Sequence, residues 1–321
     1  MKAITTMFAT FPLVAAMILA GCETTNDSSS GGTGAGNDAS PKVNPITAQA
    51  PATGPAVAEA PAVSPTLMRC GFAVFKGDGA TWVFATSAPE LKDHMAGREL
   101  AKHVTKIRHT GAGIVTVKAP DAETIAAYLA ARPGFVTRIV DGYLWVFIEG
   151  SPELRAVQAG DELAKHVTKM SNVNGQVRTI KAPDKAVIDA YLPARPGYAT
   201  RLIGGYLWVF AQGSNDLAVV DAGGELAKHV TKITNVDGQV RTLKAPDGET
   251  LRGYLLSKPG FIARVVDGYL WVFRDDSPEF DTIAEGGELA KHVTRINAVG
   301  GDVVTIKAPD SETLVAYLAD Q

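Results

Sequence analysis

Short apolar segments separated by glycine turns make up the C-terminal part of the chain, and residues 134–196 show the pattern clearly. Two pairs of such segments are rich in β-branched residues: 135–140 with 143–147, and 166–171 with 176–181. Asp141-Gly142 and Asn174-Gly175 lie between the members of each pair, and both dipeptides are typical of type I′ hairpin turns. The pattern therefore predicts two β-hairpins.

A helix is expected after each hairpin. Ser151 is a suitable N-cap with Pro152 at the first helical position, and Pro183-Asp184 opens the second helix. Apolar residues at helical spacing share one face of this second helix: Val187, Ile188, Tyr191 and Leu192. Pro196-Gly197 then marks its end. The order of elements is ββαββα.

This pattern recurs with a period of 63 residues. Identical residues keep the spacing: Trp82, Trp145, Trp208 and Trp271; His103, His166, His229 and His292; Lys118, Lys181, Lys244 and Lys307; Pro120, Pro183, Pro246 and Pro309; Tyr128, Tyr191, Tyr254 and Tyr317. No insertion interrupts the register, although loops usually tolerate changes in length. Either the duplication is recent, or the loops pack against neighbouring repeats.

The two halves of a repeat also resemble each other. Val167-Thr168-Lys169 follows Val136-Thr137-Arg138 at a distance of 31 residues, which indicates an ancestral unit of one hairpin and one helix used eight times. We therefore predict an α+β domain at 67–321. Its four ββαββα repeats lie at about 67–132, 133–195, 196–258 and 259–321. The sequence leaves open whether the array is a closed ring or an open solenoid.

The N-terminus carries a targeting signal. A charged start at Lys2 precedes an apolar run at 8–20, which is too short to span a bilayer and is typical of a signal peptide at 1–21. The run ends in Leu-Ala-Gly before Cys22, which resembles the lipobox of bacterial lipoproteins. This resemblance implies that Cys22 is lipidated and becomes the N-terminus. In lipoproteins sorted as in enteric bacteria, aspartate directly after the lipidated cysteine favours retention in the inner membrane. Glu23 stands at this position, which favours the outer membrane over the inner membrane.

Residues 22–66 are expected to form the lipidated cysteine and a disordered linker. This segment is rich in Ser, Gly, Pro and Ala and has no helical or strand periodicity. With only two cysteines, Cys22 and Cys70, the chain has no disulfide framework. Cys70 aligns with Pro133 and Pro196 of later repeats, and we expect it to be inert.

Composition and motifs argue against several function classes. A hydrophobic content of 46% is normal for a globular protein, and the formal net charge of -3 gives no indication of nucleic-acid binding. We find none of the common zinc-protease, serine-hydrolase, dithiol or phosphate-loop motifs. Every distinctive feature occurs four times, whereas catalytic sites tend to occur once. We therefore expect no enzymatic activity and no cofactor.

The repeated histidines are candidates for metal or haem ligation: His103, His166, His229 and His292. Two considerations weigh against this role. Duplication copies every residue, and the half-repeat comparison places His166 where Phe135 or Tyr198 stands, at an expected packing position. The aromatic residues Tyr143, Trp145 and Phe147 share one face of a strand and are likewise expected to be core.

Basic residues gather on the second hairpin. The candidates for anion binding are Lys165, Lys169, Arg178 and Lys181, with Lys228, Lys232, Arg241 and Lys244 one repeat later. The alternative is a solvated sheet edge, where lysines discourage aggregation.

The sequence predicts a lipid-anchored lipoprotein of the bacterial envelope. Its repeat array acts as a binding or scaffolding surface for an anionic envelope polymer or a protein. A metal- or haem-binding periplasmic protein and an unrecognised hydrolase are the alternatives.

Overall fold

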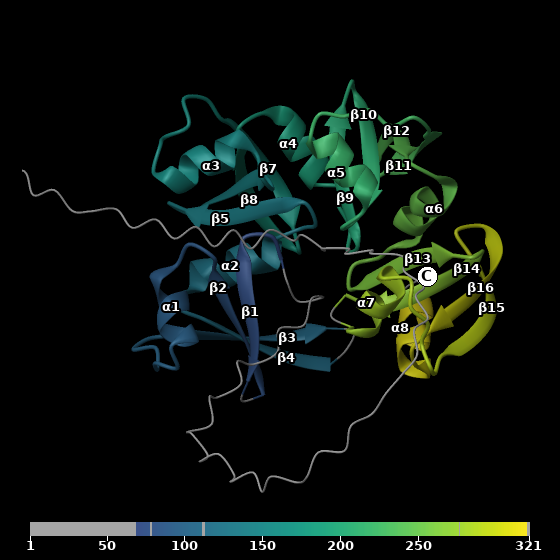
Figure 1. Ribbon diagram of the computed structural model, residues 1–321, viewed down its shortest axis with the longest axis horizontal. Helices are drawn as coiled ribbons and strands as arrows, with labels where there is room; N and C mark the ends of the chain where they lie inside the picture. Colours follow the sequence, from purple (N-terminus) through teal and green to yellow (C-terminus); the bar gives the residue numbers. More distant parts are fainter. Residues whose placement is uncertain (1–68, 78, 111–112, 276, 320–321) are drawn as a thin grey trace, which may run out of the picture. The chain divides into compact units, whose positions relative to one another are not determined.

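The computed structural model of this protein describes residues 69–77, 79–110, 113–275 and 277–319 (Figure 1). The predicted signal peptide, Cys22 and the linker lie outside these residues. The described part repeats the order ββαββα four times, so the predicted α+β repeat architecture is confirmed.

Each repeat contributes four strands and two helices. The first contains β1 (Phe72–Gly77), β2 (Ala80–Ala85), α1 (Pro89–Met95), β3 (Val104–Thr110), β4 (Gly113–Ala119) and α2 (Ala122–Ala130). The second contains β5 (Phe135–Val140), β6 (Tyr143–Ile148), α3 (Pro152–Ala159), β7 (Val167–Val173), β8 (Gln176–Ala182) and α4 (Lys185–Tyr191). The third contains β9 (Tyr198–Ile203), β10 (Tyr206–Ala211), α5 (Asn215–Asp221), β11 (Val230–Val236), β12 (Gln239–Ala245) and α6 (Gly248–Leu256). The fourth contains β13 (Phe261–Val266), β14 (Tyr269–Arg274), α7 (Glu279–Ala284), β15 (Val293–Val299), β16 (Asp302–Ala308) and α8 (Ser311–Ala319).

The four strands of a repeat form one sheet. In the second repeat the strand order is β5-β6-β8-β7, and the other three sheets follow the same order. Each hairpin is antiparallel, whereas the two central strands, β6 and β8, run parallel, with Trp145 beside Lys181. The second strands of the two hairpins therefore meet at the middle of the sheet, and the first strands form its edges.

The local signals for turns and caps act as expected. Asp141 and Asn174 have positive φ values of 53° and 51°, as a type I′ turn requires. The side chains of Ser151 and Asp184 accept hydrogen bonds from the backbone N–H groups of Leu154 and Val187, the third residues of helices α3 and α4. Helix α4 ends at Tyr191, earlier than predicted, because Pro193 lacks an N–H group that could continue it.

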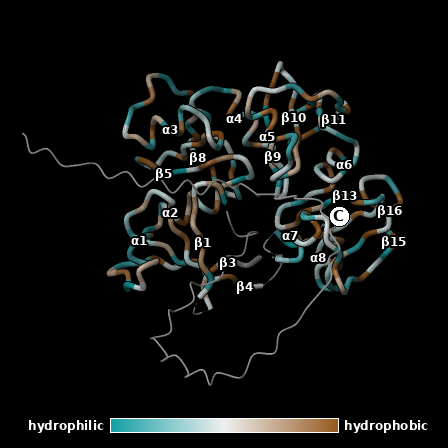
Figure 2. Tube along the Cα trace, in the orientation of Figure 1, coloured by the Kyte–Doolittle hydropathy of each residue, from teal (hydrophilic) through white to brown (hydrophobic). Residues whose placement is uncertain are grey.

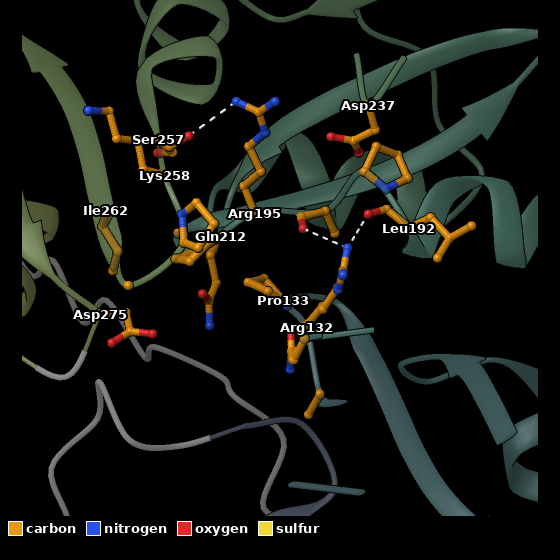
Figure 3. A pocket seen from close by; sticks show the side chains of 18 of the residues that line it. Arg132, Pro133, Leu192, Arg195, Gln212, Asp237, Ser257, Lys258, Ile262 and Asp275 are labelled. Atoms are coloured by element: carbon orange, nitrogen blue, oxygen red, sulfur yellow. Dashed lines mark hydrogen bonds between the residues drawn. The ribbon is translucent and has the colours of Figure 1, made fainter. Parts of the chain in front are cut away.

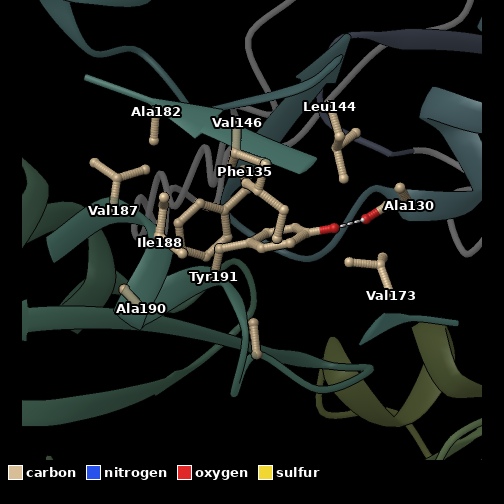
Figure 4. Close-up of a cluster of buried hydrophobic side chains, with 12 residues drawn as sticks. Ala130, Phe135, Leu144, Val146, Val173, Ala182, Val187, Ile188, Ala190 and Tyr191 are labelled. Atoms are coloured by element: carbon tan, nitrogen blue, oxygen red, sulfur yellow. Dashed lines mark hydrogen bonds between the residues drawn. The ribbon is translucent and has the colours of Figure 1, made fainter. Parts of the chain in front are cut away.

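The two helices of a repeat cover opposite faces of the sheet. Helix α4 packs on the face that carries Phe135, Leu144 and Val146, and all three side chains are fully buried (Figure 4). Helix α3 packs through Leu154 on the other face, against Phe147 and its neighbours. Strands are apolar along much of their length, as Figure 2 shows, because parts of both faces are buried.

Consecutive repeats are joined by the second helix of each. Helix α2 packs on β5, α4 on β9 and α6 on β13. Buried tyrosines reinforce these contacts with hydrogen bonds to carbonyl oxygens of the preceding repeat: Tyr191 to Ala130 at 2.6 Å, Tyr254 to Pro193 at 2.9 Å and Tyr317 to Leu256 at 2.8 Å. Each repeat thus completes the core of the next.

The loops between repeats are tightly packed, which explains the unbroken 63-residue register. Gly197 has a φ of +78°, and a Cβ atom at this position would lie 2.5 Å from Cγ2 of Ile262 in the next repeat. Gly134 packs in the same way against Arg201 and Ala199 of the next repeat. An insertion here would separate two repeats. Among the described residues, no helix has the length and apolarity needed to cross a bilayer.

Candidate binding surface

One half of each sheet is uncovered on one face. Side chains alternate along a strand, so Thr168 and Met170 of β7 point away from α4, as do their cross-strand partners Lys181 and Thr179 of β8. Val177 lies on the same face, opposite Asn172. Helix α3 covers only the first hairpin on this side. We call this set and its counterparts at intervals of 63 residues the open faces.

Large aliphatic side chains are exposed on every open face. The exposed fractions are 63% for Ile107, 70% for Met170, 70% for Ile233 and 69% for Ile296; Val177, Val240 and Val303 are exposed by 71%, 76% and 76%. A single exposed aliphatic residue is ordinary, but Met170 and Val177 are diagonal neighbours on the same face, and adjacent exposed apolar residues are typical of an interaction surface.

A histidine and a lysine border each open face beside the repeated tryptophan. The rings of His166 and Trp145 lie 5.3 Å apart, and the other three pairs lie at 5.2 Å. Nζ of Lys181 lies 3.7 Å from the centre of the Tyr143 ring and 5.4 Å from that of Trp145. Such contacts between a cation and an aromatic ring orient the lysine towards the face.

The histidines and aromatics are more exposed than the sequence indicated. All four histidines are exposed, so the expected packing role reduces to an edge contact with tryptophan. The reason is that no helix covers this end of the second hairpin. Of the aromatic trio, Phe147 is buried, Trp145 is half-buried and Tyr143 is 36% exposed. Within the described residues, no three His, Cys, Asp or Glu side chains gather as metal ligands would.

The segment that leads into the open face is identical in all four repeats. Glu-Leu-Ala-Lys-His-Val-Thr occupies 99–105, 162–168, 225–231 and 288–294, the longest identical stretch of the repeats. In the second repeat, Leu163 and Val167 are half-buried, and the other five side chains are exposed.

Several buried positions, in contrast, have diverged between the repeats. Val136, Ala199 and Ile262 are equivalent core residues, and they differ from one another in size. Loops usually vary more than cores, so an exposed segment that stays constant indicates a function rather than a packing requirement.

A second identical segment, Lys-Ala-Pro-Asp, lies beside the first. In the third repeat the two segments enclose an open hollow of about 560 Å³, lined by residues 227–230 and 246–248. Part of the identity of Lys-Ala-Pro-Asp is structural, because Ala245 is buried and Asp247 caps helix α6. The exposed Lys228 has no such structural role among the described contacts, and His229 makes an edge contact with Trp208.

The basic residues predicted to bind anions do not all lie on one surface. Lys169 and Arg178 point to the face covered by α4, where Lys169 pairs with Asp189 at 3.3 Å. Lys181 lies on the opposite, open face, and Lys165 is exposed in the connecting loop. The third repeat distributes Lys232 and Arg241, Lys244 and Lys228 in the same way. Only the loop and open-face lysines are therefore placed to bind one ligand together.

Lys169 is held in an ion pair with Asp189. Burial raises the pKa of this carboxyl group, but hydrogen bonds and charge attraction from Lys185 and Lys169 outweigh burial and hold the pKa below its usual value. Lys169 is therefore part of the support of helix α4.

A larger cavity of about 970 Å³ lies where the loops between repeats converge (Figure 3). Basic residues line it at equivalent positions: Arg69, Arg132, Arg195 and Lys258. Each donates hydrogen bonds to carbonyl oxygens at the C-terminal end of a following helix. Nη1 of Arg132, for example, bonds to Tyr191 at 3.1 Å and Ala194 at 3.2 Å.

These residues cap helix ends, a role that sequence reasoning missed. The signal was a basic residue before Pro-Gly at the start of the second, third and fourth repeats.

Comparisons with known proteins give no relative. No protein-family model, curated protein or solved structure matches the chain.

Proposed function

We propose that this protein is a lipid-anchored, non-catalytic binding or scaffolding protein of the bacterial cell envelope, favoured at the outer membrane, that engages its partner through the four open faces. The location rests on the sequence around Cys22. The binding role rests on one observation above all: an exposed segment, identical in four copies, leads into a surface of exposed aliphatic residues. Four equivalent sites bind a repetitive or multivalent partner with higher avidity than one.

An anionic envelope polymer is the second candidate for the partner. The exposed Lys165 and its three counterparts support this possibility, since they stand beside the open faces without an ion pair among the described contacts. Polymer binding would depend on charge and would weaken steeply with added salt. Binding of a protein would depend on the aliphatic residues instead.

Co-sedimentation with isolated envelopes tests the proposal. The full chain carries Cys22→Ser, so that lipid insertion does not contribute. One variant replaces the open-face residues Ile107, Met170, Ile233 and Ile296 with Ser. The control replaces four other exposed aliphatic residues with Ser: Val140, Ile203, Val219 and Val315, exposed by 46%, 42%, 43% and 58%.

We expect the first variant to lose at least tenfold in envelope binding and the control to keep it. Replacing one, two or three faces should give graded losses. Equal binding by the two four-site variants would refute the open faces as the binding surface, and so would no binding by the parent protein.

A further inference from the structure

The pseudo-symmetry within a repeat shows what kind of surface an open face is. Strand β7 follows β5 at an offset of 31 residues, with Val167-Thr168-Lys169 in place of Val136-Thr137-Arg138. Because the two helices of a repeat lie on opposite faces, the face of the first hairpin that its own helix α3 leaves uncovered, which α4 partly covers, corresponds to the open face of the second. Thr168 therefore corresponds to Thr137, and Met170 corresponds to Ile139.

The first hairpin uses this face to receive a helix from another repeat. Helix α2 packs on β5, and the hydroxyl group of the buried Thr137 donates a hydrogen bond to the carbonyl oxygen of Ala127 at 2.7 Å. One repeat later, Thr200 donates in the same way to Ala190 of α4 at 2.6 Å. At two repeat boundaries, this face of the first hairpin thus binds a helix of the preceding repeat through a threonine hydroxyl group.

The contact requires a small residue on the helix. Gly253 of α6 is equivalent to Ala127 and Ala190 at a boundary where Ala263 replaces the threonine, and a Cβ atom there would overlap the hydroxyl oxygen of Tyr198 and lie 2.9 Å from the carbonyl oxygen of Ala263. Helices that dock on this surface therefore carry Ala or Gly where they cross the strand.

The open face has the same threonine and an equivalent aliphatic residue, but no helix covers it. The threonine is identical in all four repeats: Thr105, Thr168, Thr231 and Thr294. The position of Ile139 is held by Ile or Met, with 63–70% exposure. A surface that binds a helix in one half of the repeat is therefore presented to solvent in the other half.

The edge of the open face differs from its counterpart in charge. His166 replaces Phe135, and Lys181 stands opposite Thr168, where Val146 stands opposite Thr137. Lys165 adds a further positive charge in the adjacent loop. The helix that fits this edge has acidic side chains beside its small-residue face.

We propose that each open face is a docking site for an acidic amphipathic helix of a partner protein, which packs as α2 packs on β5. The proposal deepens the function proposed above and rests on it. The helix places Ala or Gly over the threonine, accepts its hydroxyl proton in a hydrogen bond, and covers the exposed Ile or Met. Four such sites hold up to four helices.

The probe is a peptide with the sequence of residues 121–132, in which Tyr128→Glu replaces the side chain that packs in the core of the first repeat with an acidic one and leaves Ala127 unchanged. A lactam bridge between outward positions keeps it helical, since free helices of this length are marginal. The control peptide carries Ala127→Lys in addition. Both are titrated into the full chain carrying Cys22→Ser, with fluorescence anisotropy as the readout.

We expect saturable binding of up to four probe peptides per chain and no binding of the control peptide. The combined substitutions Ile107→Glu, Met170→Glu, Ile233→Glu and Ile296→Glu should abolish binding. Val in place of the four threonines should weaken it about fivefold, the effect of one hydrogen bond. Circular dichroism of each variant verifies that the fold is kept.

Four outcomes would overturn the helix proposal. In the first, the probe binds the Glu variant as well as it binds the parent. In the second, the probe fails to bind while envelope binding still depends on the open-face residues; the proposed function then stands without a helical partner. If inorganic polyphosphate binds instead, in a salt-sensitive manner that requires Lys165 and its counterparts, the partner is an anionic polymer. Loss of envelope binding in the parent protein itself would remove both proposals.

Discussion

Replacing Gly197 with Ala tests the close packing between repeats. The backbone at Gly197 has a φ of +78°, and the new Cβ atom would lie 2.5 Å from Cγ2 of Ile262. Left-handed backbone at a non-glycine residue costs about 1–2 kcal/mol. Overpacking against a side chain fixed in a β-strand adds about 1–3 kcal/mol. We therefore expect Gly197→Ala to lower the free energy of unfolding by about 2–5 kcal/mol.

Gly142 supplies a matched control. Its φ is +77°, and a Cβ atom there would meet nothing within 4 Å, so Gly142→Ala adds only the backbone cost of about 1–2 kcal/mol. Urea unfolding of the two variants, followed by circular dichroism, measures the difference. The packing term alone should separate them by about 1–3 kcal/mol.

A double-mutant cycle assigns the extra cost to one contact. Ile262→Ala removes the atom in question and is itself destabilising, by about 2–5 kcal/mol. On that background, Gly197→Ala should cost no more than Gly142→Ala does. The reasoning is wrong if the Gly197 and Gly142 variants are equally stable, or if the two changes at 197 and 262 are additive.

Three further predictions concern the anchor, the histidines and pH. Cys22→Ser should abolish lipid labelling and leave the protein unprocessed or soluble, and retained label would refute the lipobox. Changing His166 and His229 together to Phe should leave metal content unchanged and cost little stability, and stoichiometric metal lost in this variant would contradict that expectation. The lowered pKa of Asp189 means that its stabilising pairs are complete above the ordinary pKa of 3.8 and are lost as pH falls through its lower folded value. Asp189→Asn should therefore make unfolding less dependent on pH below the ordinary pKa of 3.8, and an unchanged pH profile would show that the pairs contribute nothing.

The repeat architecture could be predicted because its signals are local. Asp141-Gly142 sets a hairpin turn, and Asp184 caps a helix, through residues a few positions apart. The period of 63 residues then places every element in the chain.

The binding surface could not be predicted in the same way, because it depends on which face a helix covers. Alternation separates Lys169 from Lys181, but only the position of α4 shows that Lys169 faces Asp189 and that Met170 is left exposed. The helix-capping role of Arg132 has the same cause. Its hydrogen-bond acceptors lie about 60 residues further along the chain, in a helix that local patterns do not place beside it.

This capping also means that no repeat after the first is self-sufficient. Arg132 ends the first repeat yet caps helix α4 of the second, and Tyr191 of that helix bonds back to Ala130. Arg195 with Tyr254, and Lys258 with Tyr317, form the same reciprocal link at the next two boundaries. Stability is therefore shared between nearest neighbours, as in a one-dimensional cooperative chain. Fraying of the last repeat leaves Lys258 without its acceptor and exposes the end of α6, so the loss of order spreads inward from the terminus.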